Sequence, residues 1–161
     1  MHAVRPFWRS ELRIHWVISL NFLLLTVAYN IACQFWPETW RVHWPEADRM
    51  LLRSVLYAMV IIFFPLVKLL RHILLRLNQT MPGPKPAAAR YLQTVLITSS
   101  LMQTVGLLGW GLFVLGDELR TLYIYDALTL LGLFLHKPNS EEYLDICAAR
   151  DAAEYATRSK I

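Results

Sequence analysis

Apolar residues are gathered into four long runs, and the clearest of these occupies residues 51–70. It reads LLRSVLYAMVIIFFPLVKLL, with no charged residue between Ser54 and Val67. About 20 mostly apolar residues suffice to span the ~30 Å hydrocarbon core of a bilayer as a helix. Lipid offers no partner for backbone N–H and C=O groups, so a single such run is expected to be helical. The pattern therefore predicts a membrane-spanning helix, with Pro65 removing one backbone N–H near its end.

Three further runs cover residues 15–36, 91–115 and 119–135. Gly116, Asp117 and Glu118 separate the last two runs and predict a tight turn. The fourth run is short and is interrupted by Asp126. We expect an all-α polytopic membrane protein, a four-transmembrane-helix bundle formed by residues 1–136.

The remaining residues, 137–161, are polar and predict one more helix. Asn139 and Glu142 have the spacing of a capping box in which Asn replaces Ser or Thr. Weakly apolar residues then share one stripe of the helix: Leu144, Cys147, Ala148 and Tyr155. We expect a cytoplasmic amphipathic tail helix that lies on the membrane surface, on the basic 71–90 loop or on a partner.

Three tryptophans recur every four residues between the first two runs. Trp36, Trp40 and Trp44 would share one face of a helix. Pro37 suits the first turn of such a helix, and Pro45 would end it. Tryptophan prefers the headgroup zone, so we expect interface anchors on a short helix lying at the membrane surface. The alternative is an aromatic platform for a ligand.

Composition and charge agree with a membrane protein. The 161 residues are 56% hydrophobic and 17% charged, against about 45–50% and 25% in soluble domains. The net charge of +4 arises from Lys and Arg at the ends of the apolar runs, which favours orientation in a membrane over nucleic-acid binding. Cys33 and Cys147 lie too far apart in this topology to suggest a disulfide or a metal cluster.

The same charges predict the orientation of the spans. With both termini inside, the outer loops and span tips hold four of the sixteen Lys and Arg residues: Arg41, Arg49, Arg53 and Arg120. The positive-inside rule then predicts cytoplasmic N- and C-termini in a bacterial inner membrane. Arg5, Arg9 and the apolar segment 17–28 also resemble a signal peptide, and YNIAC at 29–33 resembles a lipoprotein cleavage site. Asn30 replaces the aliphatic residue of such sites, so we expect an uncleaved anchor.

Asp126 is the most distinctive candidate for function. It lies about 10 Å into the fourth run at 1.5 Å per residue, and a carboxylate at that depth is costly and often functional. At the same level we expect an intramembrane polar cluster of Asn30, Arg53, Tyr57, Tyr123 and Asp126. Three interpretations follow: an Arg53–Asp126 ion pair that locks the bundle, a fourth span that begins later so that Asp126 is interfacial, or a proton or ion site.

The third run carries a stripe of small and hydrogen-bonding residues. Ser99, Gln103, Gly106 and Trp110 share one helical face. Such residues usually hold membrane helices together. We expect helix packing against another span of this chain or against another copy, with a substrate path as the alternative.

The histidines raise the question of haem. His15, His72 and His136 all lie at the inner ends of runs, and Arg13-Ile14-His15-Trp16 resembles the start of the first span in the small four-helix b-type cytochromes. That resemblance implies haem held by histidine pairs at matched levels inside the bundle. No histidine lies within an apolar run here, so we expect interfacial histidines and no cofactor.

No catalytic motif is present in the sequence. No histidine is placed to activate Ser54 or Ser99, and the GPKP segment lacks the ending of a phosphate loop. We therefore expect no enzymatic activity, and a structural, assembly or interaction subunit of a larger membrane complex. The expected partners are the lipid bilayer and either a protein partner or a homo-oligomer, without nucleic acid. The alternatives are an oligomeric ion- or proton-conducting protein using Asp126, and a b-type cytochrome membrane subunit.

Overall fold

All regular structure in the described part of the chain is helical, which confirms the all-α prediction. The computed structural model describes residues 10–81 and 85–158. The five α-helices are α1 Ser10–Gln34, α2 Glu46–Thr80, α3 Ala87–Val114, α4 Leu119–Leu135 and α5 Ser140–Arg158, and a 3-10 turn, η1, spans Glu38–Trp40. Arg5, Arg9 and residues 82–84 of the predicted loop lie outside the described residues.

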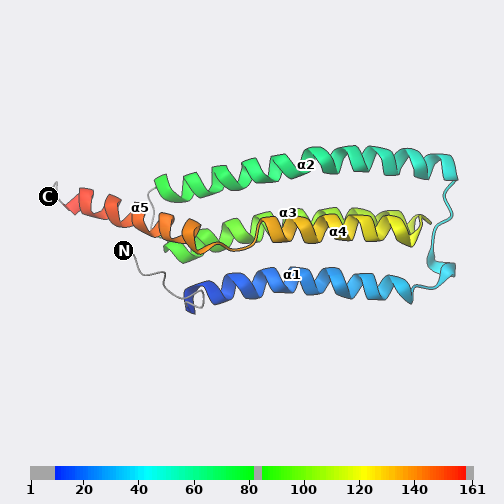
Figure 1. Ribbon diagram of the computed structural model, residues 1–161, viewed down its shortest axis with the longest axis horizontal. Helices are drawn as coiled ribbons and strands as arrows, with labels where there is room; N and C mark the ends of the chain where they lie inside the picture. Colours follow the sequence, from blue (N-terminus) through cyan, green and yellow to red (C-terminus); the bar gives the residue numbers. More distant parts are fainter. Residues whose placement is uncertain (1–9, 82–84, 159–161) are drawn as a thin grey trace.

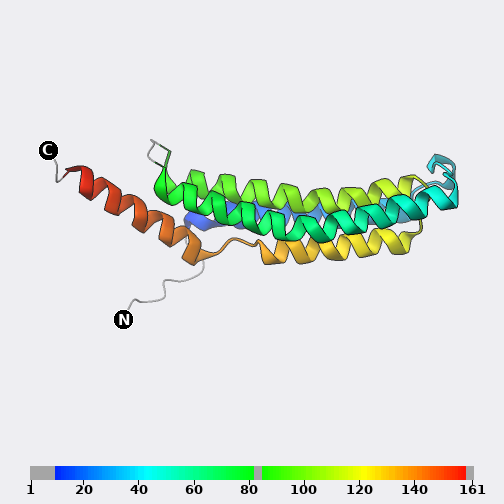
Figure 2. The same cartoon turned by 90° about the horizontal axis from the view of Figure 1, so that it is seen from above.

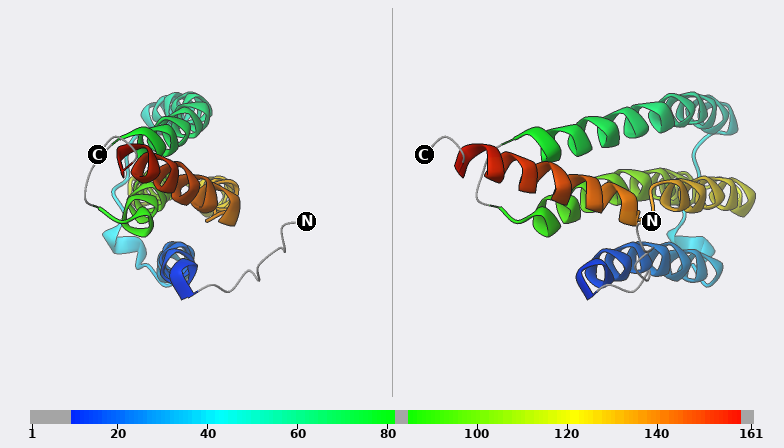
Figure 3. Two further views of the ribbon diagram at one scale, coloured as in Figure 1. Left: turned by 90° about the vertical axis from the view of Figure 1, so that its left-hand side faces the viewer. Right: turned by 60° about the vertical axis from the view of Figure 1, so that its left-hand side comes forward.

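Helices α1 to α4 are antiparallel in succession along the long axis of the molecule, which lies horizontally in Figure 1. Helices α3 and α4 lie together in the middle, with α1 and α2 on opposite sides of them, as the views in Figures 1 and 3 agree. Helix α1 begins at the end of the bundle from which α5 extends (Figure 2). We call this the terminal end, and the opposite end, where α1 meets η1 and α3 meets α4, the far end.

Among the described residues, three helices are long and apolar enough to cross a membrane: Leu12–Gln34 within α1, α2 and α3. The most apolar segment of α3 is 50% buried inside the bundle, against 11% for those of α1 and α2. Helix α3 is therefore the core helix. The flanking helices expose most of their apolar side chains to the outside, among them Leu24 on α1 and Ile61 on α2.

Close packing of α3 against α4 depends on glycines. A Cβ added at Gly109 would lie 2.5 Å from the Cβ of Tyr125, and one added at Gly132 would overlap the Sδ of Met102. Larger residues at these positions would push the two helices apart, as expected where small residues let helices approach closely. Helix α2 completes this core by burying Val60 and continues as one helix through Pro65.

The predicted tryptophan helix is reduced to a single 3-10 turn. Only Glu38–Trp40 form a helical turn, with Pro37 before it, and the chain from Arg41 to Trp44 is not helical. Pro45 precedes the first turn of α2 and does not end a helix. The missing N–H of each proline is tolerated at a helix start, where that donor would lack a partner anyway. Trp40 and Trp44 are exposed, whereas Trp36 is half-buried.

Helix α5 packs on the bundle mainly through residues outside the predicted apolar stripe. Tyr143 and Ile146 of α5 are buried, and they pack with residues of α1 and α3: Leu12, Tyr91 and Val95. Leu144 and Tyr155 of the predicted stripe are exposed. Tyr143 lies on the face of α5 that packs against the bundle, and its ring centroid is 5.9 Å from that of Tyr91.

Candidate functional site

A buried arginine joins four helices at the terminal end. Arg71 of α2 is 6% exposed. Its Nε and Nη2 donate to the two carboxylate oxygens of Glu142 on α5, at 3.3 and 2.7 Å. Nη1 donates to Thr98 Oγ1 of α3 at 3.2 Å and to the carbonyl oxygen of His136 at 2.8 Å, and Nη2 donates to that of Lys137 at 3.2 Å. Five contacts equal the number of N–H donors that a guanidinium has. We call this the Arg71 junction.

Tyr91 completes the junction from α3. Its hydroxyl lies 3.0 Å from Glu142 Oε2 and 3.1 Å from the carbonyl oxygen of Asn139, and it accepts from the Asn139 N–H at 2.7 Å. The carbonyl groups at a helix C-terminus have no partner within the helix. At the end of α4 they are satisfied by the Arg71 junction, which also fixes the direction in which α5 leaves the bundle.

Asp126 lies in the interior of the bundle and is 5% exposed. Its Oδ1 accepts from the hydroxyl of Tyr29 at 2.7 Å, and its Oδ2 accepts from the side-chain amide of Asn30. Both partners are neutral side chains of α1. One turn along the same helix, Thr26 Oγ1 lies 3.1 Å from Gln103 Oε1 of α3. Polar contacts therefore join α1 to both central helices in the middle of the bundle.

The predicted Arg53–Asp126 ion pair is wrong. Arg53 Nη1 lies 3.0 Å from Asp117 Oδ1 and 3.5 Å from Thr121 Oγ1, near the turn between α3 and α4. Asp117 is 3% exposed, and its Oδ1 also accepts from the backbone N–H of Glu118 at 3.0 Å. The sequence allows residues on neighbouring helices to be paired by their distance along the helix axis. It does not show toward which neighbouring helix each side chain points.

The residues of the predicted polar cluster separate for the same reason. Consecutive helical residues point about 100° apart. Tyr125 therefore faces α2 and stacks on Tyr57, with ring centroids 5.0 Å apart and planes at 8°, whereas Asp126 faces α1. Asn30 and Asp126 are brought together, and Tyr123 is exposed. Tyr29 was missed by the sequence reasoning, although a tyrosine next to Asn30 inside an apolar run was an available signal.

Three arginines at the far end hold the turn between α3 and α4. Arg41 and Arg49 donate to the carbonyl oxygens of Asp117 and Gly116, and the third is Arg53, described above. Gly116 has a φ of +94°, and a Cβ there would lie 2.7 Å from the carbonyl oxygen of Val42. Cationic side chains stabilise the last carbonyls of a helix, so Arg41 and Arg49 serve as caps for the C-terminal end of α3.

The stripe of small and polar residues on α3 faces α1 of the same chain. Gln103 contacts Thr26, and a Cβ added at Gly106 would overlap the hydroxyl of Tyr29. Trp110 packs edge-on against Trp36, with ring centroids 6.3 Å apart and planes at 89°. The fourth member of the stripe, Ser99, is buried.

The three histidines toward the terminal end, His15, His72 and His136, occupy different surroundings. The His15 ring is buried, lies 3.2 Å from the carbonyl oxygen of Ala88 and packs near Tyr91. His136 is buried, and its Nδ1 lies 2.8 Å from the carbonyl oxygen of Gly132. His72 is exposed. No group of three His, Cys, Asp or Glu side chains able to hold a metal ion occurs within the described residues.

No protein-family model, curated protein or solved structure matches this chain. The function is therefore inferred from the chain's own residues.

Proposed function

We propose that this chain is a small integral protein of a bacterial inner membrane that acts as a structural, assembly or interaction subunit of a larger membrane complex. In this proposal α1 to α4 are four spans, both termini are cytoplasmic, and residues 137–161 form an amphipathic cytoplasmic tail. The three long apolar helices and the close packing of α4 against α3 support the four-span arrangement. The excess of Lys and Arg expected on the inner side supports the orientation.

The observation that carries the proposal is that the buried charged side chains are bonded to groups of this chain. Arg71 contacts five acceptors, and the buried Asp117 pairs with the half-buried Arg53. Polar contacts of this kind hold membrane helices in fixed positions. The outward surfaces of α1 and α2, by contrast, are large and apolar. A rigid bundle with such surfaces is suited to docking on another membrane protein.

Photo-crosslinking in living cells tests this proposal. A photoreactive residue is placed singly at exposed positions of α1 and α2: Leu20, Leu24, Ile61 and Leu69. We expect one face to give a discrete protein adduct after irradiation, with a mass that separates a second copy from another protein. The positions on the other faces serve as the matched control, because they should give no such adduct. Absence of a protein adduct at all four positions would contradict the subunit proposal.

A second candidate, proton or ion conduction through an oligomer, is favoured by one observation. Asp126 is buried and its hydrogen-bond partners are neutral, and intramembrane carboxylates commonly mark proton or ion paths. Flux into vesicles that contain the purified chain separates the candidates. Conduction predicts a flux that Asp126→Asn abolishes without loss of protein yield, whereas the subunit proposal predicts the background flux for both proteins.

A further inference from the structure

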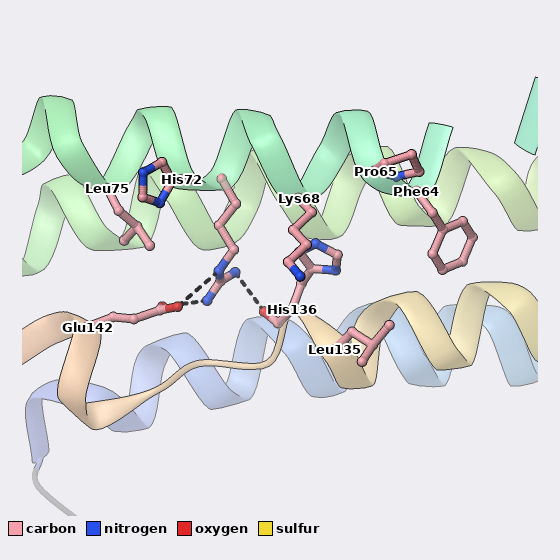
Figure 4. A pocket seen from close by; sticks show the side chains of 9 residues that line it. Phe64, Pro65, Lys68, His72, Leu75, Leu135, His136 and Glu142 are labelled. Atoms are coloured by element: carbon pink, nitrogen blue, oxygen red, sulfur yellow. Dashed lines mark hydrogen bonds and ion pairs between the residues drawn. The ribbon is translucent and has the colours of Figure 1, made fainter. Parts of the chain in front are cut away.

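A cleft of about 520 Å³ opens beside the Arg71 junction, between α2 and the end of α4 (Figure 4). One part of its lining is apolar and the other part carries charged or titratable groups. The apolar part consists of Phe64, Pro65, Leu75 and Leu135, and the polar part of Lys68, Arg71, His72, His136 and Glu142.

The positive charge available to a ligand in this cleft comes from Lys68. Arg71 is already paired with Glu142 at 2.7 Å and bonded to two carbonyl oxygens. Lys68 is exposed and makes no hydrogen bond or ion pair with any residue that the structure describes. Its side chain points across the cleft toward His136 in Figure 4. His72, one turn further along α2, is exposed and can add a second donor.

The polar and apolar parts of the cleft follow one another along α2. Phe64 and Pro65 belong to the uncharged segment of this helix, Lys68 is the first charged residue after it, and His72 follows. At 1.5 Å per residue, Phe64 and His72 are separated by about 12 Å along the helix axis. In the proposed orientation, this change from apolar to polar residues along α2 coincides with the boundary between hydrocarbon and headgroups on the cytoplasmic side.

We propose that this cleft binds an anionic phospholipid, with its phosphate at Lys68 and His72 and an acyl chain along Phe64 and Leu135. Basic pockets between membrane helices on the cytoplasmic side are suited to anionic headgroups. The ammonium group supplies the charge complement, and the adjacent apolar wall supplies a surface that inorganic phosphate would not use. This inference rests on the membrane placement proposed above, but not on the identity of any protein partner.

Lipid binding to the purified full chain tests the inference. The chain is placed in a neutral detergent with phosphatidylcholine, phosphatidylglycerol is titrated in, and bound lipid is counted by native mass spectrometry. We expect saturable phosphatidylglycerol binding that Lys68→Gln weakens about fivefold, because each basic group near an anionic headgroup contributes about that factor. Lys68→Gln combined with His72→Gln should weaken it further. Arg76→Gln is the matched control, since Arg76 is exposed on the same helix and lies outside the cleft.

Further measurements distinguish a lipid phosphate from inorganic phosphate, and a failure of the lipid proposal from a failure of the membrane placement. Inorganic phosphate at the same concentration should neither bind saturably nor compete, and competition by it would assign the cleft to a soluble anion and overturn the lipid proposal. Equal losses in Lys68→Gln and Arg76→Gln, or equal binding of both lipids, would also overturn it. A chain recovered in the soluble fraction of the cells would instead refute the membrane placement, before any lipid is added.

Discussion

Arg71 Nη2 and Glu142 Oε2 lie 2.7 Å apart, and this pair joins the core of the bundle to the helix that leaves it. The arginine side chain is 8% exposed and the glutamate side chain 26% exposed. Removing one partner of a buried ion pair leaves the other charge without compensation, which costs more than the pair contributes. The pair therefore adds to the apolar contacts of Tyr143 and Ile146 that hold α5 on the bundle.

Arg71→Gln should lower the free energy of unfolding by about 3 kcal/mol, because Glu142 loses its cation and two carbonyl oxygens at the end of α4 lose their donor. Arg71→Lys should recover only part of this loss, since an ammonium cannot reproduce the planar five-donor geometry. Thermal unfolding in detergent measures both variants. The exposed Arg76→Gln is the control, and equal melting temperatures for Arg71→Gln and Arg76→Gln would contradict the account.

Arg53 should be energetically coupled to Asp117 and not to Asp126. Arg53→Leu leaves the buried Asp117 carboxylate without its cation, so the further change Asp117→Leu should cost less in that background than in the wild type. Arg53→Leu and Asp126→Leu should instead give additive losses. Melting temperatures of the single and double variants provide the two cycles. Coupling in the Asp126 cycle alone would reinstate the pair predicted from the sequence.

Apolar patterning predicted that each run is helical, but not how far α2 extends, because its charged ends at 46–50 and 71–80 are helical as well. It also did not predict which faces of the helices meet. The run at residues 119–135 coincides with α4, because the Gly-containing turn before it and the Lys-Pro step after it mark where this helix begins and ends. Which residue pairs with Arg53 depends on how α4 is rotated about its axis. In the structure Tyr125 faces α2 and Asp126 faces α1, so Asp126 points away from the helix that carries Arg53. The face of α5 depended on Tyr143, which a stripe of small residues does not reveal.

Gly106→Ala should displace the Tyr29 hydroxyl from Asp126, because the added Cβ would overlap that hydroxyl and lie 3.0 Å from Thr129 Oγ1. Loss of a hydrogen bond to a charged group costs about 1.5–3 kcal/mol, offset by about 1 kcal/mol from replacing a helical glycine. The same substitution should cost less in a Tyr29→Phe background, which lacks the hydroxyl.

Gly111→Ala is the matched control for this prediction. Gly111 lies on the same helix, and a Cβ there would meet nothing within 4 Å. It should therefore stabilise the protein slightly. Equal effects of the two alanine substitutions on the melting temperature would show that the approach of Tyr29 to Gly106 does not constrain the bundle.

The stability of the terminal end should fall in mild acid through His136. Burial lowers the pKa of His136 below its usual value of 6.5, and the nearby Arg71 acts in the same direction. The unfolded chain then takes up a proton at a higher pH than the folded chain does, so the free energy of unfolding decreases as pH falls below about 6.5. His136→Gln should reduce the loss of stability between about pH 7.5 and pH 5. The exposed His43→Gln should not change it, and identical pH profiles for all three proteins would exclude His136 as the cause.

The side of the membrane on which the C-terminus lies tests the central claim most directly. In the part of the chain that the structure describes, three helices are long apolar candidates for spans, whereas the 17-residue α4 covers about 25 Å. Crossing by α4 therefore decides between three and four spans. Fluorescent-protein and alkaline-phosphatase fusions are made after Ile161, with fusions after Trp44 as the opposite-side control. We predict a fluorescent and phosphatase-inactive fusion after Ile161 and the reverse after Trp44. An active phosphatase with a dark fluorescent protein after Ile161 would contradict the four-span account.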